Sequence, residues 1–180
     1  MSAAAEIVAD FCLTGFGQFC GVPENPTTSL MRDLPAFLAS DLAAHRIRLS
    51  SCTVLETSRN CIPTLLALQH SGSASAPASS ATTETAAALP AHRTIFLHLG
   101  VASSSTEFAL EDRAYNDADF RVPDESGWQP RCQPIDCAVG DTAFHHRTRF
   151  DLARLCDSLR GKQHAVRVSQ SAGRFICNFV

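Results

Sequence analysis

The feature that most constrains the fold of this 180-residue chain is a set of short apolar runs that alternate with helical segments. The first run, Ile7–Gly15, has the length and composition of a strand buried in a parallel sheet. Further strands are predicted from similar patterns at Arg46–Leu55, Thr94–Gly100, Phe108–Tyr115 and His164–Ser169. Because helices separate these strands, the pattern predicts a three-layer α/β/α sandwich with a mostly parallel central sheet. Ligands are expected at the carboxyl ends of its strands.

Helical spacing indicates where the covering helices lie. Asn25 and Pro26 supply an N-cap and a first-turn proline for a helix that carries leucines 30, 34, 38 and 42 along one face. Pro35 should kink or split this helix. Two further helices are predicted over 57–69 and 143–160, and another is expected to begin near Gly173.

Between about residues 71 and 91 the sequence consists almost entirely of Ser, Ala, Thr and Pro. Such a segment buries too little apolar surface to offset the entropy of ordering it, so we predict a disordered insertion. Thr94–Gly100 is too apolar to stand alone and must pair with strands that precede the insertion. Residues 1–180 are therefore predicted to form a single domain.

Composition excludes several classes of function. Fifteen basic and eighteen acidic residues leave a net charge of −3, so no summed positive field would hold a nucleic acid. No stretch approaches the ~20 apolar residues that cross a bilayer, and the N-terminus lacks a basic region before an apolar one. These features predict a cytosolic protein without nucleic-acid or membrane partners.

The eight cysteines do not point to a disulfide scaffold or a metal site. The chain is long and apolar enough to fold without disulfides, so we interpret them as mostly reduced thiols. Cys132 and Cys137 have no second pair and no nearby histidine to complete a zinc site, and no metal or cofactor is expected. A nucleotide-binding fold is also disfavoured, because Gly15 and Gly17 lack the third glycine of the dinucleotide motif.

The segment Ser169–Asn178 carries the strongest chemical signal. It follows a predicted strand and is expected to enter a helix with Cys177 near its start. A thiol near the positive end of a helix dipole favours the thiolate, which is the nucleophilic form. The alternative interpretation of Cys177 is a buried structural thiol.

Four ordered blocks of this sequence resemble pyroglutamyl-peptidase I, a family of cysteine omega-peptidases that remove an N-terminal pyroglutamate. Ser169–Asn178 is similar to the family's nucleophile motif, Ser-x-x-Ala-Gly-x-Phe/Tyr-x-Cys-Asn/Asp. The other blocks are Thr14–Gly21 with Asn25–Pro26, then Leu99–Gly100 leading to Phe108–Asn116, and finally Arg121–Asp124. Gln18 and Cys20 stand where the family more often has proline and glycine.

The resemblance implies roles for nine residues. Cys177 would attack the carbonyl that follows the pyroglutamyl ring and form an acyl-enzyme, Glu111 would orient the imidazole of a base, and Arg121 would stabilise the oxyanion. The neutral lactam needs an apolar pocket, whose implied walls are Phe16, Phe19, Thr53, Val122, Phe175 and Ile176. The expected partners are peptides with N-terminal pyroglutamate.

The resemblance also implies a catalytic histidine well beyond the cysteine, whereas three residues follow Cys177 here. His98 lies within a predicted strand, which favours a packed or hydrogen-bonded histidine over a substitute base. Two explanations remain open. The sequence is an incomplete product of an active enzyme that lacks the family's C-terminal elements, or it is a catalytically dead truncated homologue that binds blocked peptide N-termini.

Overall fold

The computed structural model describes residues 9–73 and 93–179. The described residues divide into two compact units. The first comprises those of Met1–Glu56 and Cys61–Leu99, and the second those of Thr57–Asn60 and Gly100–Val180. None of the helices in the described parts of the chain has both the length and the apolar character that a bilayer crossing requires.

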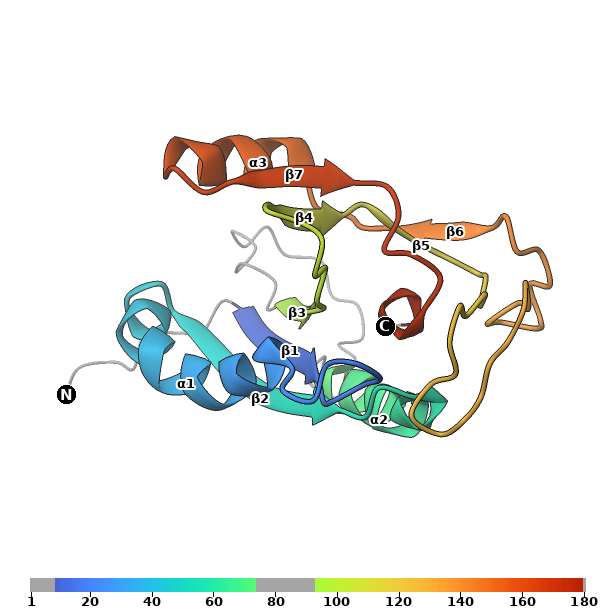
Figure 1. Ribbon diagram of the computed structural model, residues 1–180. Helices are drawn as coiled ribbons and strands as arrows, with labels where there is room; N and C mark the ends of the chain where they lie inside the picture. Colours follow the sequence, from blue (N-terminus) through green and yellow to red (C-terminus); the bar gives the residue numbers. More distant parts are fainter. Residues whose placement is uncertain (1–8, 74–92, 180) are drawn as a thin grey trace, which may run out of the picture. The chain divides into compact units, whose positions relative to one another are not determined.

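The first unit is built around a three-stranded parallel sheet. Its strands are ordered β2-β1-β3, with β1 in the centre (Figure 1). The elements, in chain order, are β1 (Ala9–Phe16), α1 (Pro26–Ala44), β2 (Ile47–Leu55), α2 (Ile62–Ser73) and β3 (Arg93–His98). The short helix η1 (Arg59–Cys61) precedes α2.

Helix α1 packs on β1 and β2, and its start follows the sequence closely. Asn25 caps the helix, because its side chain accepts a hydrogen bond from the Thr27 N–H at 3.0 Å. A side chain at Gly15 would come within 2.9 Å of Met31, so glycine lets the helix approach the sheet this closely. The buried residues of α1 are Thr27 and Met31 rather than the predicted leucine face, and Leu30 is exposed. Pro35 does not split the helix.

Strand β3 pairs with β1 over Arg93–His98. Strands on both sides of the predicted insertion therefore belong to one sheet, as expected. Helix α2 runs to Ser73, which is three residues into the segment predicted to be disordered, and residues 74–91 of that segment lie outside the described residues. The single-domain organisation of residues 1–180 stays a prediction.

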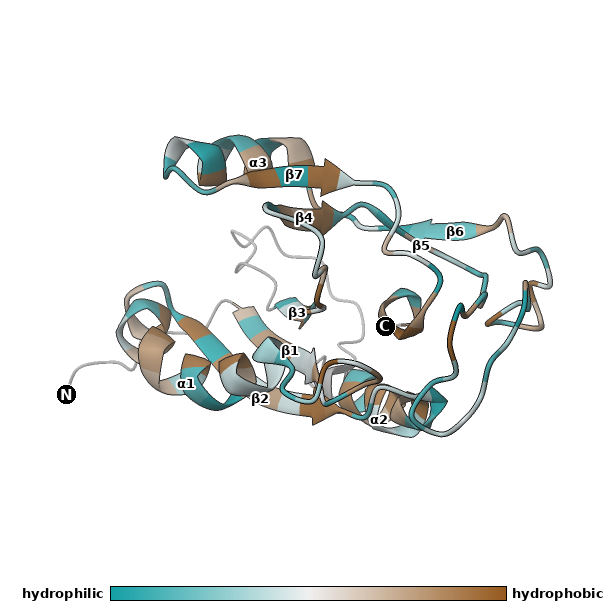
Figure 2. Ribbon diagram, viewed as in Figure 1, coloured by the Kyte–Doolittle hydropathy of each residue, from teal (hydrophilic) through white to brown (hydrophobic). Residues whose placement is uncertain are grey.

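The second unit contains two small sheets and one helix. Strand β4 pairs with β7 in parallel, β5 pairs with β6 antiparallel, and α3 packs against β7. The elements are β4 (Phe108–Glu111), β5 (Arg113–Tyr115), β6 (His145–Arg147), α3 (Leu152–Gly161), β7 (Val166–Ser169) and the short helix η2 (Ile176–Asn178). Figure 2 shows that β4 and β7 are mainly hydrophobic, whereas β6 is hydrophilic.

The predicted strand over 108–115 is interrupted at Asp112, where the chain changes partners. The Asp112 N–H donates to Ser169 at the end of β7, while its C=O accepts from the N–H of Thr148, just after β6. The Asp112 carboxylate is hydrogen bonded by Arg147 and Arg113, which hold its pKa below the ordinary value. This residue is a junction between the two sheets.

The predicted helix over 143–160 is wrong in its first half. Residues 145–147 form β6, and the helix begins at Leu152. The reason is an N-cap, since the Asp151 carboxylate accepts from the N–H of Arg154 at 3.0 Å. The helical spacing of apolar residues holds from Leu152 onward, and Cys156 is the buried residue of this helix.

Candidate functional site

The candidate site begins at the carboxyl ends of β4 and β7. Glu111 is the last residue of β4, and it is paired in register with Ser169, the last residue of β7. The loop from Gln170 to Phe175 leaves β7 at this edge and leads to the turn that carries Cys177. The parallel pairing therefore brings a carboxylate and a candidate nucleophile from distant parts of the sequence to one edge.

Cys177 is half-buried, and its sulfur lies beside Gly100. Burial raises the pKa of the Cys177 thiol, the residue's own backbone N–H lowers it in part, and the negative charge of Glu111 raises it again. Glu111 therefore contributes to the electrostatic environment of the thiol. With its pKa raised, the thiol needs a base to remove its proton before it can attack a carbonyl.

The predicted helix near Gly173 is not found among the described residues. Gly173 has a positive φ of 81°, and Phe175 is extended, so helical geometry starts only at Ile176 and gives the three-residue turn η2. The helical segment therefore begins three residues later than predicted, and Cys177 is its second residue. The burial that raises the pKa of Cys177 opposes the expected favouring of the thiolate by a helix end.

Arg121 is exposed on the loop that connects β5 to β6. Within the described part of the chain, its guanidinium has neither a hydrogen bond nor an ion pair, and only its backbone C=O is bound, by the Gln129 side chain. Asp124 shapes this loop by accepting from Ser126, Trp128 and Arg59.

The predicted pocket residues of the second unit differ in exposure. Ile176 is fully buried, and Phe175 packs on Phe120 with ring centroids 4.6 Å apart. Phe120 also contacts Trp128 and Phe179. The rings of Phe120, Trp128, Phe175 and Phe179 therefore form an aromatic cluster that includes the residues on both sides of the turn. Val122 is exposed, next to Arg121.

The remaining predicted pocket residues lie in the first unit. Phe16 is buried at the end of β1, where its N–H donates to Thr27, and Phe19 is half-buried in a bridge with Val22. Thr53 is half-buried in β2, paired with Thr14. The second unit therefore contains six of the nine predicted site residues: Cys177, Glu111, Arg121, Val122, Phe175 and Ile176.

His98 is a structural histidine in β3, as its position in a strand predicted. Its Nδ1 lies 2.6 Å from Thr14 Oγ1, and burial lowers the pKa of the ring, which favours the neutral imidazole. In residues 9–73 and 93–179, no histidine is hydrogen bonded to Cys177 or Glu111. The same residues contain no cluster of three or more His, Cys, Asp or Glu side chains placed to hold a metal ion.

Gly100 and Asn178 stand in blocks that resemble the family, but the sequence assigned neither residue a role. A Cβ on Gly100 would lie 3.0 Å from Cys177 Sγ, so only glycine leaves the sulfur its present space. Asn178 is buried and binds the backbone of Tyr115 and Asp117. The Asn or Asp that follows the cysteine in the family's motif is the signal that could have drawn attention to Asn178.

Comparisons with known proteins agree with the α/β fold and with the family that the sequence resembles. The profile of the pyroglutamyl peptidase family matches residues 74–180, more than half of the chain. A pyrrolidone-carboxylate peptidase of Pseudomonas fluorescens is 30% identical over 93% of this chain and 67% of its own length. One of Enterococcus faecalis is 26% identical over 92% of this chain and 65% of its own length.

Solved structures show the same relationship. The pyrrolidone carboxyl peptidase of Fervidobacterium islandicum superposes with a TM-score of 0.72 and 25% identity, covering 94% of this chain and 69% of that one. This shared fold confirms the predicted α/β sandwich with a mostly parallel sheet. Some curated relatives are matched over less of their length, one by only 40%. The family match and the shared fold place the chain among the peptidases, and it belongs to the pyroglutamyl peptidase family.

Proposed function

We propose that this protein hydrolyses the bond that follows an N-terminal pyroglutamate, through an acyl-enzyme on Cys177. The observation that carries the proposal is that Glu111 ends β4 in register with the last residue of β7, the strand that leads into the Cys177 turn. The negative charge of Glu111, which contributes to the raised pKa of the Cys177 thiol, supports it. Membership of the pyroglutamyl peptidase family supports the substrate class. The proposed partners are free peptides with a cyclised N-terminus, in the cytosol.

The proposed mechanism follows from the protonation state of the site. A base takes the proton from the Cys177 thiol as the sulfur attacks the carbonyl, and the same group, now charged, protonates the leaving amine. Water then hydrolyses the thioester. Glu111 holds the imidazole of this base in one tautomer and stabilises its charged form. A cation between Glu111 and Cys177 would also reverse the unfavourable effect of the carboxylate on the thiolate.

The base in this proposal is the histidine that the family resemblance places beyond the cysteine. His98 is not proposed for the role, since its Nδ1 is held by Thr14 in β3. Arg121 is proposed to stabilise the oxyanion together with the backbone N–H of Cys177. Its support is a guanidinium that has no bound partner within the described residues and so is available for a substrate oxygen.

The proposed pocket explains why an ordinary N-terminus would be rejected. The lactam is neutral and needs apolar walls with a few backbone partners, whereas a free α-ammonium needs an acidic group. The proposed walls that lie in the second unit are all apolar: Val122, Phe175 and Ile176. Such a surface would select peptides whose N-terminus is blocked by cyclisation.

A second candidate function is binding of blocked N-termini without turnover. The raised pKa of Cys177 favours it, because a thiol that stays protonated is a poor nucleophile. The two functions share a pocket and differ in whether a base acts on Cys177.

A fluorogenic pyroglutamyl amide distinguishes these functions. Turnover is measured for the 180-residue chain and for the protein as its gene encodes it, each with Cys177 intact or replaced by alanine. We expect Cys177→Ala to abolish turnover and Cys137→Ala, an exposed thiol of the same unit, to leave it unchanged. Turnover that survives Cys177→Ala would contradict the site, and tight binding of a lactam peptide without turnover in either form would favour the second function.

A further inference from the structure

Asn178, the residue after Cys177, uses its whole side chain to bind backbone of the strand region. Its Oδ1 accepts from the Tyr115 N–H at 2.8 Å, and its Nδ2 donates to the C=O groups of Tyr115 at 2.7 Å and Asp117 at 3.0 Å. The side chain is only 3% exposed. One amide thus pairs with both the N–H and the C=O of Tyr115, as the backbone of a neighbouring strand would.

The two segments that Asn178 joins are those that carry the proposed catalytic groups. Tyr115 is the last residue of β5, four residues after Glu111 and connected to it through Asp112. Cys177 immediately precedes Asn178 in the turn η2. The amide therefore fixes the turn with the thiol to the segment that continues from the carboxylate.

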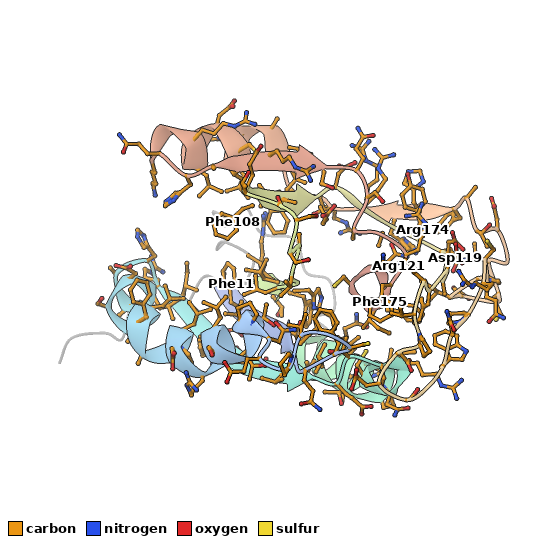
Figure 3. All side chains as sticks on the ribbon, in the orientation of Figure 1. Phe11, Phe108, Asp119, Arg121, Arg174 and Phe175 are labelled. Carbon is orange, nitrogen blue, oxygen red and sulfur yellow. The ribbon has the colours of Figure 1, made fainter. Side chains whose placement is uncertain are left out.

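A second attachment holds the other end of this turn. The guanidinium of Arg174 lies 3.9 Å from the centroid of the Tyr115 ring, and its Nε is 3.1 Å from Asp117 Oδ2. The C=O of Arg174 accepts from the N–H of Asp119 at 3.3 Å. Figure 3 shows Arg174 and Asp119 close together. Residues 174 and 178 both bind the 115–119 segment, one on each side of Cys177.

The turn is tied to the 115–119 segment by side chains and not by its own backbone hydrogen bonds. Those bonds run from the N–H of Asn178 to the C=O of Phe175 and from the N–H of Phe179 to the C=O of Ile176, and no side chain caps the start of the turn. Both bonds stay within the turn. The attachments through residues 174 and 178 therefore hold Cys177 against the 115–119 segment, and the Asn178 amide is the buried one.

We propose that Asn178 is a positioning residue that sets the place of the Cys177 thiol relative to Glu111, by pairing its amide with Tyr115. The proposal rests on the proposed function, because it assigns Asn178 a part in the same reaction. Without the amide, one N–H and two C=O groups of the half-buried residues Tyr115 and Asp117 lose their partner, and the turn shifts to let water reach them. The thiol moves with the turn.

Asn116 provides a matched control. It is also a buried asparagine of the second unit with three hydrogen bonds, from the Asp136 N–H to its Oδ1 at 2.6 Å and from its Nδ2 to the C=O groups of Asp136 and Asp141. These bonds join the 136–141 loop to the same 115–119 segment, and none of them reaches the Cys177 turn. Replacing either asparagine by alanine removes a buried side-chain amide that makes three hydrogen bonds to backbone groups.

The test compares Asn178→Ala and Asn116→Ala in the protein as its gene encodes it, with two measurements. The first is the pair kcat and KM for a pyroglutamyl amide. The second is the pH profile of alkylation of Cys177 by iodoacetamide, resolved from the other thiols by peptide mass spectrometry. Asn178→Ser, which keeps one hydroxyl for these partners, serves where the alanine variant does not fold.

We expect Asn178→Ala to lower kcat by about 10²-fold, as a displaced catalytic group does, with KM changed much less. Cys177 should be alkylated at least about threefold faster at neutral pH, because a displaced thiol is less buried and ionises more readily. Asn116→Ala should leave both quantities within about twofold of the parent protein. A merely structural role predicts equal changes in the two variants, and that result would overturn the proposal. If Cys177→Ala retains turnover, the proposed function fails, while the alkylation comparison still decides whether Asn178 positions the thiol.

Discussion

Replacing Gly100 by alanine tests whether the space beside the thiol matters. The added Cβ would lie 3.0 Å from Cys177 Sγ and 3.8 Å from Cys177 Cβ. Attractive contact between such atoms starts at about 3.5 to 4.0 Å, so the sulfur must retreat by roughly 0.5 to 1 Å. Gly100 does not have the left-handed φ that only glycine adopts easily, so the substitution acts through this contact and not through backbone strain.

The expected loss follows from this displacement. A misplacement of about 1 Å lowers an enzymatic rate by about 10²-fold, so half of that predicts roughly a tenfold lower kcat/KM for Gly100→Ala. The assay is turnover of a fluorogenic pyroglutamyl amide, together with the alkylation rate of Cys177. Gly161→Ala in the last turn of α3 is the control, because nothing lies within 4 Å of its added Cβ. Equal kcat/KM values in the two variants and the parent would refute the reasoning.

Three further predictions concern charge and capping. Glu111→Gln should lower the pKa of Cys177 and speed its alkylation near neutral pH while abolishing turnover, and an unchanged alkylation profile would contradict the proposed proximity. Asn25→Ala should lower the free energy of unfolding by about 1 to 2 kcal/mol, measured by urea denaturation, since α1 loses its N-cap. Hydrogen bonds from Arg147 and a second arginine depress the pKa of Asp112, so the stability they provide is present above its ordinary pKa of about 4 and is lost as the pH falls below that value. The stability difference between the parent and Asp112→Asn should therefore be full near about pH 6 and shrink below about pH 4.

Much of the fold could be predicted because hydrophobic patterning is local. Ile7–Gly15 and Arg46–Leu55 match β1 and β2 within two residues, and Asn25 caps α1 as expected. The strand that carries Glu111 could also be predicted, because the run from Phe108 is apolar, although its end at Glu111 was not. A mostly parallel sheet was predicted as well, and the parallel pairing of β4 with β7 agrees with it.

The rest depended on contacts between distant residues, which periodicity does not report. Asp112 ends β4 because its backbone and carboxylate bind β7, Arg113 and the β6 region, and a single strand was predicted in its place. The helix expected near Gly173 failed on the conformations of Gly173 and Phe175. Asn178 and Gly100 acquire their roles only through what lies against them in space.

The parallel pairing of β4 with β7 has a consequence for biosynthesis. Within the described residues, β7 is the partner of β4, yet it begins at Val166, long after β4 ends at Glu111. At about 5 to 20 residues per second, a ribosome needs roughly 3 to 11 s to make the intervening chain. For that interval β4 is an apolar strand without its neighbour, open to association with other nascent chains. A chaperone that shields this stretch early in translation would raise the yield of folded protein more than one that acts after release.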